Sequence, residues 1–453
     1  MIRTKLAKLK GDQVAARLLR NLKWIVSSQV AMAILGMVSL AVAARALGAA
    51  GLGALALIEA FARIIARLVH LEPWQAVIHH GSAALENKDQ GRFARLIGLS
   101  VLLDIAGGVL AAVVVLALAP MLAPVMGLEG QPATYLTLGA LAVLVSLRAT
   151  GIALLRLYDR FDVLAKIDTA TAAFRAILSV IAYLLGGDLL HFVAIFIAFS
   201  LVEGLAAYLF GRREMKRHGQ TMTLSGMQAM LTANPGFLRL MWNSNLAVIL
   251  RQTTQRLDVV ILATLVAPVY VGHYHIARRC GEAAIRLGRP IKQVVFPEFA
   301  RFAARGEYQK ISKTATSISL GFTAVLVAGL LPTLWFIEPL VTSIFGPDFA
   351  AATTVVSVQA IAVALFLAGV ILGPVLLSLD ADRGLMWTGV VTAALFFVLL
   401  YPLVSMFGVT GAALTHLICN SLWLIACIWL THRALRAKAT RPAANASEQE
   451  EPV

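Results

Sequence analysis

Apolar segments of about 20 residues or longer recur along this chain of 453 residues and leave little sequence for anything else. A helix needs about 20 predominantly apolar residues to cross a bilayer. Inside the hydrocarbon core, only helices and closed barrels satisfy their backbone hydrogen bonds. The pattern therefore predicts an all-α polytopic membrane protein. We expect twelve spanning helices, at 22–44, 52–79, 95–119, 133–155, 168–186, 189–211, 241–265, 270–296, 313–335, 350–377, 384–404 and 409–431.

The composition excludes a separate soluble domain of any size. Hydrophobic residues make up 59% of the chain and charged residues only 14%, against about 25% in a soluble protein. Cysteine is scarce, because Cys280, Cys419 and Cys427 are the only three and all lie in apolar stretches. No disulfide framework or zinc-ligand spacing is present.

The net charge of +15 is explained by membrane topology better than by nucleic-acid binding. Lys and Arg concentrate in alternate connections between the apolar segments, with Arg45 as the lone exception. This is the distribution that places basic loops in the cytoplasm. It predicts that both termini are cytoplasmic.

The two halves of the chain are related by an offset of 219 residues. The matched pairs are Pro120 and Pro339, Gly127 and Gly346, and Gly53 and Gly272. Six spanning helices fall in each half, so both halves begin and end on the same side. The repeat is therefore expected to be parallel, with its site at the interface of the two halves, as in two-half transporters.

These boundaries define five regions. Residues 1–21 are basic with interspersed leucines, which predicts a cytoplasmic amphipathic segment. The N-terminal six-helix bundle is 22–211, a cytoplasmic linker is 212–240, and the C-terminal bundle is 241–432. The polar, acidic segment 433–453 is expected to be a disordered cytoplasmic tail.

Arginine exceeds acid inside the predicted spans, and such charges usually face a cavity or a partner. The arginines that we expect to line a substrate cavity are Arg63, Arg67, Arg278, Arg286 and Arg289. They lie on stripes spaced by three or four residues, which keeps each set on one helix face. Guanidinium groups bind phosphate bidentately, so the cavity is predicted to be cationic and to suit an anionic ligand. The alternative is structural, since Glu59–Arg63 and Glu282–Arg286 have helical ion-pair spacing.

Acidic residues in the spans are candidates either for ion coupling or for structural pairing. They are Glu59, Asp104, Glu203, Asp258 and Glu282. A coupling ion would be H⁺ or Na⁺. For Asp104 and Glu203, structural pairing is the favoured interpretation.

Motifs for ATP hydrolysis and zinc catalysis are absent from the sequence, and no cofactor is expected. The connections on the outer side offer only scattered groups such as Glu129 and Asp348. A membrane enzyme of envelope polysaccharide assembly is therefore a remote alternative, and we expect a transporter.

Several segments carry a family resemblance. They are AARALGAAGLGAL (43–55), VGHYHIARR (271–279), FPEFAR (296–301), IFGPDFAAA (344–352) and FGVTGAAL (407–414). Over residues 20–432 the chain resembles polysaccharide flippases of the Wzx type, within the multidrug/oligosaccharidyl-lipid/polysaccharide exporter superfamily. The twelve expected spans favour this branch over lipid II flippases of the same superfamily, which usually have fourteen.

The resemblance implies two six-helix bundles around a central cavity, and it also implies a substrate and partners. An oligosaccharide linked through pyrophosphate to undecaprenol would move from the cytoplasmic to the periplasmic leaflet of a bacterial inner membrane. A polymerase and export components would be possible partners, and a monomer is the default state. The alternative within the superfamily is an ion-coupled multidrug exporter, but such proteins typically carry cationic drugs, which the surplus arginine disfavours.

Overall fold

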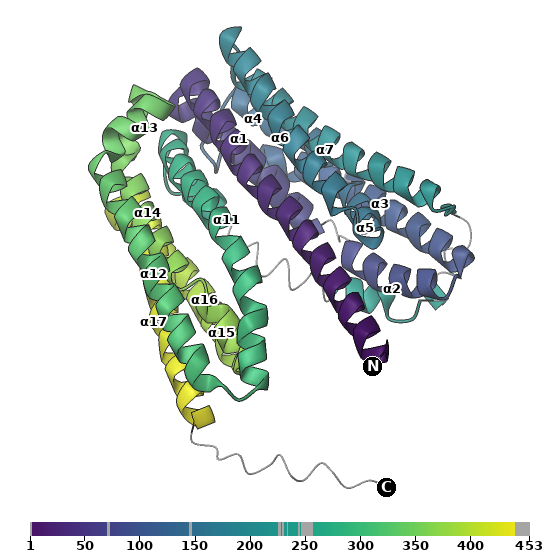
Figure 1. The fold of residues 1–453 in the computed structure, drawn as a ribbon. Helices are drawn as coiled ribbons and strands as arrows, with labels where there is room; N and C mark the ends of the chain where they lie inside the picture. Colours follow the sequence, from purple (N-terminus) through teal and green to yellow (C-terminus); the bar gives the residue numbers. More distant parts are fainter. Residues whose placement is uncertain are drawn as a thin grey trace. The chain divides into compact units, whose positions relative to one another are not determined.

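The computed structural model describes residues 2–69, 73–144, 147–224, 228, 231–232, 234–242, 245 and 257–439. Within these ranges the secondary structure is helical, with no strand. The chain forms two compact units, residues 1–275 and 276–453, and the boundary falls inside one helix. Each unit is a set of long, roughly parallel helices (Figure 1). The prediction of an all-α polytopic protein is confirmed.

The first unit contains α1 (Ile2–Val69), α2 (Trp74–Glu86), α3 (Gln90–Leu122), α4 (Gln131–Leu144), α5 (Arg148–Leu157), α6 (Phe161–Leu184), α7 (Leu189–Arg217), α10 (Leu257–Ala263) and the start of α11 (Pro268–Ala304). The second unit contains the rest of α11, then α12 (Tyr308–Trp335), α13 (Ile337–Phe345), η1 (Pro347–Ala352), α14 (Thr353–Ala368), α15 (Leu372–Ser378), α16 (Asp382–Phe407) and α17 (Val409–Ala439).

Among the described residues, nine helical segments are long and apolar enough to cross a bilayer. Large apolar side chains on these segments are exposed in the isolated protein, such as Leu320, Val325 and Leu331 on α12. Hydrocarbon contact accounts for this, because a soluble protein rarely leaves such a stripe in water.

The predicted number of twelve spans is not confirmed, for two physical reasons. The segment Lys23–Val69 of α1 counts once, although its 47 residues are enough for two crossings. Helix α11 covers the predicted span 270–296 but carries six charges between Arg278 and Lys292, so its composition alone does not mark it as membrane-spanning. Most of the predicted span 241–265 lies outside the described residues.

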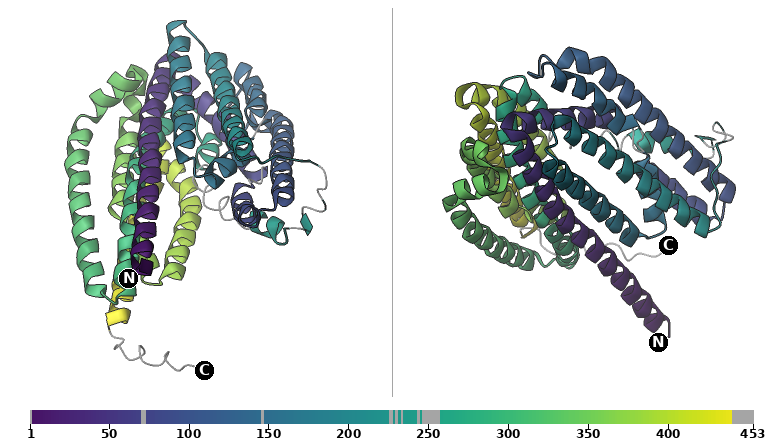
Figure 2. Two further views of the ribbon diagram at one scale, coloured as in Figure 1. Left: turned by 45° about the vertical axis from the view of Figure 1, so that its right-hand side comes forward. Right: turned by 90° about the horizontal axis from the view of Figure 1, so that it is seen from above.

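Helix α1 contains the first two predicted spans and is interrupted at a single residue. Gly48 has φ 64° and ψ −175°, a conformation that glycine adopts easily and other residues do not. The predicted connection at 45–51 is thus reduced to one non-helical glycine. The helix also continues through residues 2–22, and its amino-terminal end extends past the neighbouring helices of its unit (Figure 2).

Two other predicted boundaries move because helices continue. Helix α7 runs to Arg217, so the first residues of the expected linker 212–240 are helical. Helix α17 runs to Ala439, and the remainder of the expected tail lies outside the described residues. At its other end α7 begins with a capping box, in which Asp188 and His191 each accept a hydrogen bond from the other's backbone amide. The adjacent side chain of His191, whose Nδ1 lies 2.8 Å from Oδ1 of Asp188, holds the pKa of Asp188 below its usual value.

Helices α1 and α11 cross at the two glycines that the 219-residue offset relates. A Cβ atom on Gly53 would lie 1.8 Å from the carbonyl oxygen of Pro268, and one on Gly272 would lie 2.1 Å from that of Ala49. Ala49 and Pro268 are themselves related by the same offset. The contact is therefore reciprocal, as at a two-fold axis, and it allows backbone-to-backbone packing of the kind that small residues permit in membranes.

The second unit is held together by α14, α16 and α17. Gly411 packs on the Leu403 carbonyl, where a Cβ would lie 2.0 Å from the oxygen. Cys419 and Cys427, both on α17, are buried.

Candidate functional site

A buried carboxylate lies between two arginines inside the first unit. Glu59 on α1 is 3% exposed. Its Oε2 lies 3.3 Å from Nη2 of Arg63, one turn along the same helix, and its Oε1 accepts a hydrogen bond from Nη2 of Arg175 on α6. We call these three residues the Glu59 cluster. Both arginines also contact aromatic rings of α7, because Arg63 lies 5.2 Å from the Phe196 centroid and Arg175 5.5 Å from that of Phe199.

A second charged group lies two turns away along α6. Arg148, at the start of α5, is 3.0 Å from Asp168 of α6 and 3.3 Å from Glu203 of α7. We call these three residues the Arg148 cluster. Asp168 and Arg175 are seven residues apart, which puts them on the same face of α6 about 10 Å apart.

The two clusters are complementary in charge. The Glu59 cluster has two arginines and one carboxylate, and the Arg148 cluster has one arginine and two carboxylates. Charges within membrane-spanning helices are retained mainly where they pair or serve a pathway. An arginine of these clusters can therefore bind an anion while the carboxylates stay paired with the other arginines.

The other predicted arginines occupy different places. Arg67 is half-buried one turn beyond Arg63 on α1. Arg278 and Arg286 are half-buried on the part of α11 that belongs to the second unit. The side chain of Arg289 lies outside the described part of the structure. That these residues act together stays a prediction.

The predicted acidic residues have different surroundings. Asp104 is fully buried in α3, and its Oδ2 accepts a hydrogen bond of 2.9 Å from the backbone amide of Thr150. This bond joins α3 to α5, which favours a structural role. Glu282 lies 3.6 Å from Arg279, three residues earlier on α11, and its expected pairing with Arg286 stays a prediction.

Asp258 is also fully buried, at the start of α10. Its Oδ2 accepts a hydrogen bond of 2.7 Å from the hydroxyl of Tyr274 on α11, and its Oδ1 accepts one of 2.8 Å from the amide of Val259. A protonated carboxyl could instead donate to the tyrosine oxygen, so this pair accommodates either charge state.

Sequence reasoning missed three residues of these clusters as site candidates: Arg148, Asp168 and Arg175. A charge within an apolar segment is the signal that could have found Arg148 and Arg175, since they lie inside the predicted spans 133–155 and 168–186. Their partners are 20 to 116 residues away, so no local spacing reveals the pairs. Among the described residues, His, Cys, Asp and Glu form no group that could hold a metal ion.

Comparison with known families decides the affiliation of the chain. Residues 18–303 match the model of a family described as polysaccharide biosynthesis protein, which is more than half of the chain. The chain belongs to this family. In sequence it is similar to the inner membrane protein YghQ of Escherichia coli, with 28% identity over 349 residues that cover 76% of this chain and 96% of YghQ.

Solved structures show that this family member has a transporter fold. It superposes on an inward-facing multidrug resistance transporter of the MATE family, of the MOP superfamily, with a TM-score of 0.70, 14% identity, and coverage of 91% of this chain and 96% of that one. It also superposes on the lipid II flippase MurJ in an inward closed conformation, with a TM-score of 0.61, 11% identity, and coverage of 86% and 88%. The resemblance to the exporter superfamily is confirmed, and the polysaccharide biosynthesis protein shares its fold with membrane transporters.

Proposed function

We propose that this protein flips polyprenyl-pyrophosphate-linked oligosaccharide units across a bacterial inner membrane, from the cytoplasmic to the periplasmic leaflet. The family match over residues 18–303 carries the proposal. The fold shared with a lipid II flippase and the similarity to an inner membrane protein support it. The termini would lie in the cytoplasm, as the distribution of Lys and Arg favours.

In this proposal the pyrophosphate binds arginines of the predicted set, and the polyprenyl tail stays in lipid. Arg63 is suited to this role because it shares Glu59 with Arg175. When a phosphate binds Arg63, Glu59 stays paired with Arg175. Phosphate binding therefore leaves no buried carboxylate without a cationic partner. The remaining cations of the cavity would be Arg67, Arg278, Arg286 and Arg289.

The test is a deletion strain complemented with variants. Deletion is expected to accumulate complete lipid-linked oligosaccharide on the cytoplasmic side and to remove surface polysaccharide, as measured by lipid extraction and polymer staining. Arg67→Ala and Arg286→Ala are each expected to lower surface polymer at least about tenfold at normal protein abundance, because losing a charged hydrogen bond to phosphate costs about 1.5–3 kcal/mol.

The matched control is Arg305→Ala, an exposed arginine in the connection after α11, which should restore wild-type polymer. Normal polymer from both Arg67→Ala and Arg286→Ala would overturn the cationic cavity. Unchanged lipid-linked pools in the deletion strain, with altered tolerance of toxic cations, would overturn flipping and identify an exporter.

An ion-coupled exporter is the second candidate function. The pair of Asp258 and Tyr274 favours coupling of transport to an ion gradient, whether the protein is a flippase or an exporter. We propose that Asp258 carries the coupling ion, because its hydrogen bond to Tyr274 can form with the carboxyl charged or neutral. A proton or a sodium ion fits this role.

Coupling through Asp258 makes a direct prediction for reconstituted protein. Transport by the wild type should accelerate under an imposed proton or sodium gradient, and Asp258→Asn should abolish this response, because an amide cannot change charge. Glu282→Gln, at a half-buried pair with Arg279 on α11, is the comparison and should keep the response. A gradient response in Asp258→Asn equal to that of the wild type would exclude the assignment.

A further inference from the structure

An open groove of about 480 Å³ lies between α6 and α7 in the first unit. Its volume is within the range of small-molecule sites. Apart from Thr171, the walls are apolar, formed by Val163, Ile167, Ala170 and Phe174 from α6 and by Val202, Ala206 and Phe210 from α7. These positions are spaced by three or four residues, so each set is one helix face. None of the predicted site residues lines the groove.

Cations surround one end of this groove. Arg160, Lys166, Arg213 and Arg217 line it, against the single carboxylate of Glu214. Glu214 is buried and already binds two of them, Arg160 and Arg217. Two cations therefore stay available to a ligand.

Arg213 and Lys166 are those two cations, and both are exposed. Arg213 makes no ion pair with any residue of the described ranges. Nζ of Lys166 lies 5.3 Å from the ring centroid of Trp24, and this contact does not neutralise its positive charge.

The position of the groove matches the layers of a bilayer. Its apolar walls lie within α6 and α7, which are both candidate spans, and its cations lie at the start of α6 and the end of α7. Val202 is 39% exposed and Phe210 44% exposed, so the groove is open along its side. The cationic end is the one that the basic connections assign to the cytoplasm.

We propose that this groove binds one anionic phospholipid of the cytoplasmic leaflet. An acyl chain fills the apolar walls between α6 and α7, and the phosphate lies between Arg213 and Lys166. Basic pockets between spanning helices on the cytoplasmic side are suited to anionic headgroups. The lipid would join the two helices and stabilise the unit, independently of what the protein transports.

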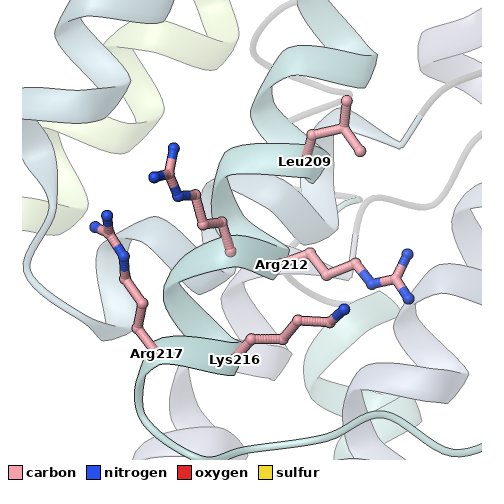
Figure 3. A pocket seen from close by; sticks show the side chains of 5 residues that line it. Leu209, Arg212, Lys216 and Arg217 are labelled. Carbon is pink, nitrogen blue, oxygen red and sulfur yellow. The ribbon is translucent and has the colours of Figure 1, made fainter.

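Membrane topology alone does not explain why cations line the groove, because other cations at the same end of α7 do not line it. Arg212 and Lys216 carry the same charge and are the sequence neighbours of the groove residues Arg213 and Arg217, yet they do not line the groove. They extend to the side of α7 opposite Arg217 (Figure 3). Replacing them changes the net charge as much as replacing Lys166 and Arg213, which makes them a matched control.

The experiment measures binding of phosphatidylglycerol to the purified full-length protein in detergent, by the rise in Tm and by native mass spectrometry, with phosphatidylcholine as the neutral comparison. Each cation near an anionic lipid surface changes affinity roughly fivefold. Lys166→Gln/Arg213→Gln should therefore weaken phosphatidylglycerol binding about 30-fold, whereas Arg212→Gln/Lys216→Gln should bind like the wild type.

A second variant addresses the groove itself. Ala170→Trp fills it from an exposed position on α6, so it should fold normally and lose the same Tm rise. Equal binding of phosphatidylglycerol and phosphatidylcholine, or binding unaffected by both groove variants, would overturn the proposal. A Tm rise given by undecaprenyl phosphate and not by phosphatidylglycerol would also overturn it, since the groove would then hold the carrier lipid.

Discussion

Gly53→Val is expected to abolish the accumulation of folded protein. Its Cβ would lie 1.8 Å from the Pro268 carbonyl oxygen, a backbone atom that cannot rotate away. Separating α1 from α11 would also disturb the reciprocal contact of Gly272 with Ala49. We expect a loss above about 4 kcal/mol, at the extreme of single substitutions. Size-exclusion profiles of fluorescent fusions and the Tm in detergent measure it.

Gly36→Ala is the matched control, because Gly36 lies in the same helix and its Cβ would meet nothing within 4 Å. It should be neutral or stabilise the protein by up to about 1 kcal/mol, through the higher helix propensity of alanine. Gly272→Val should behave like Gly53→Val, since the contact is reciprocal. Normal folding of Gly53→Val would show that the helices do not cross at these glycines.

Glu59→Ala is expected to produce the second largest effect. It removes the one carboxylate of the Glu59 cluster and leaves the guanidinium groups of Arg63 and Arg175 near each other in a buried site. Breaking a buried ion pair from one side costs about 3–5 kcal/mol. The Tm in detergent and the amount of surface polysaccharide are the measurements.

The exposed pair of Glu298 and Arg301 provides the control, because Glu298→Ala removes an exposed carboxylate 2.6 Å from its partner. Such surface pairs contribute about 0–1 kcal/mol, so its Tm should barely change. Glu59→Leu/Arg175→Leu separates structure from function. If it recovers the Tm but not transport, the cluster acts on substrate. If it recovers both, the cluster is structural, and a Glu59→Ala effect no larger than that of Glu298→Ala would show that the pair is not buried.

The sequence is sufficient to predict what depends on composition and local spacing. Apolar length predicts the helices, and spacing by four predicts the ion pair of Glu59 and Arg63. The same local rule is insufficient for Arg175, because its carboxylate partner is 116 residues away and is brought close only by packing of α6 on α1. Likewise, the offset of 219 residues identifies Gly53 and Gly272 as equivalents, but not as neighbours.

The number of membrane spans is predicted poorly where a helix carries many charges or where two spans join into one helix. The charges of α11 lower its mean hydropathy below that of a typical span, and α1 continues through its predicted connection because one glycine is sufficient for the kink. Arg148 shows the converse difficulty. Arg148 can be recognised in the sequence as a charge within an apolar segment. Its partners on α6 and α7 cannot be predicted in the same way, because they depend on how three helices pack.

The charge balance of the two clusters has an electrical consequence. Together they contain three arginines and three carboxylates, so a rigid movement of these six residues through the membrane field transfers no net charge. Moving one elementary charge through 100 mV amounts to about 2.3 kcal/mol of electrical work. These clusters would contribute none of it, and any voltage dependence of transport would come from charges elsewhere in the protein or from the cargo itself.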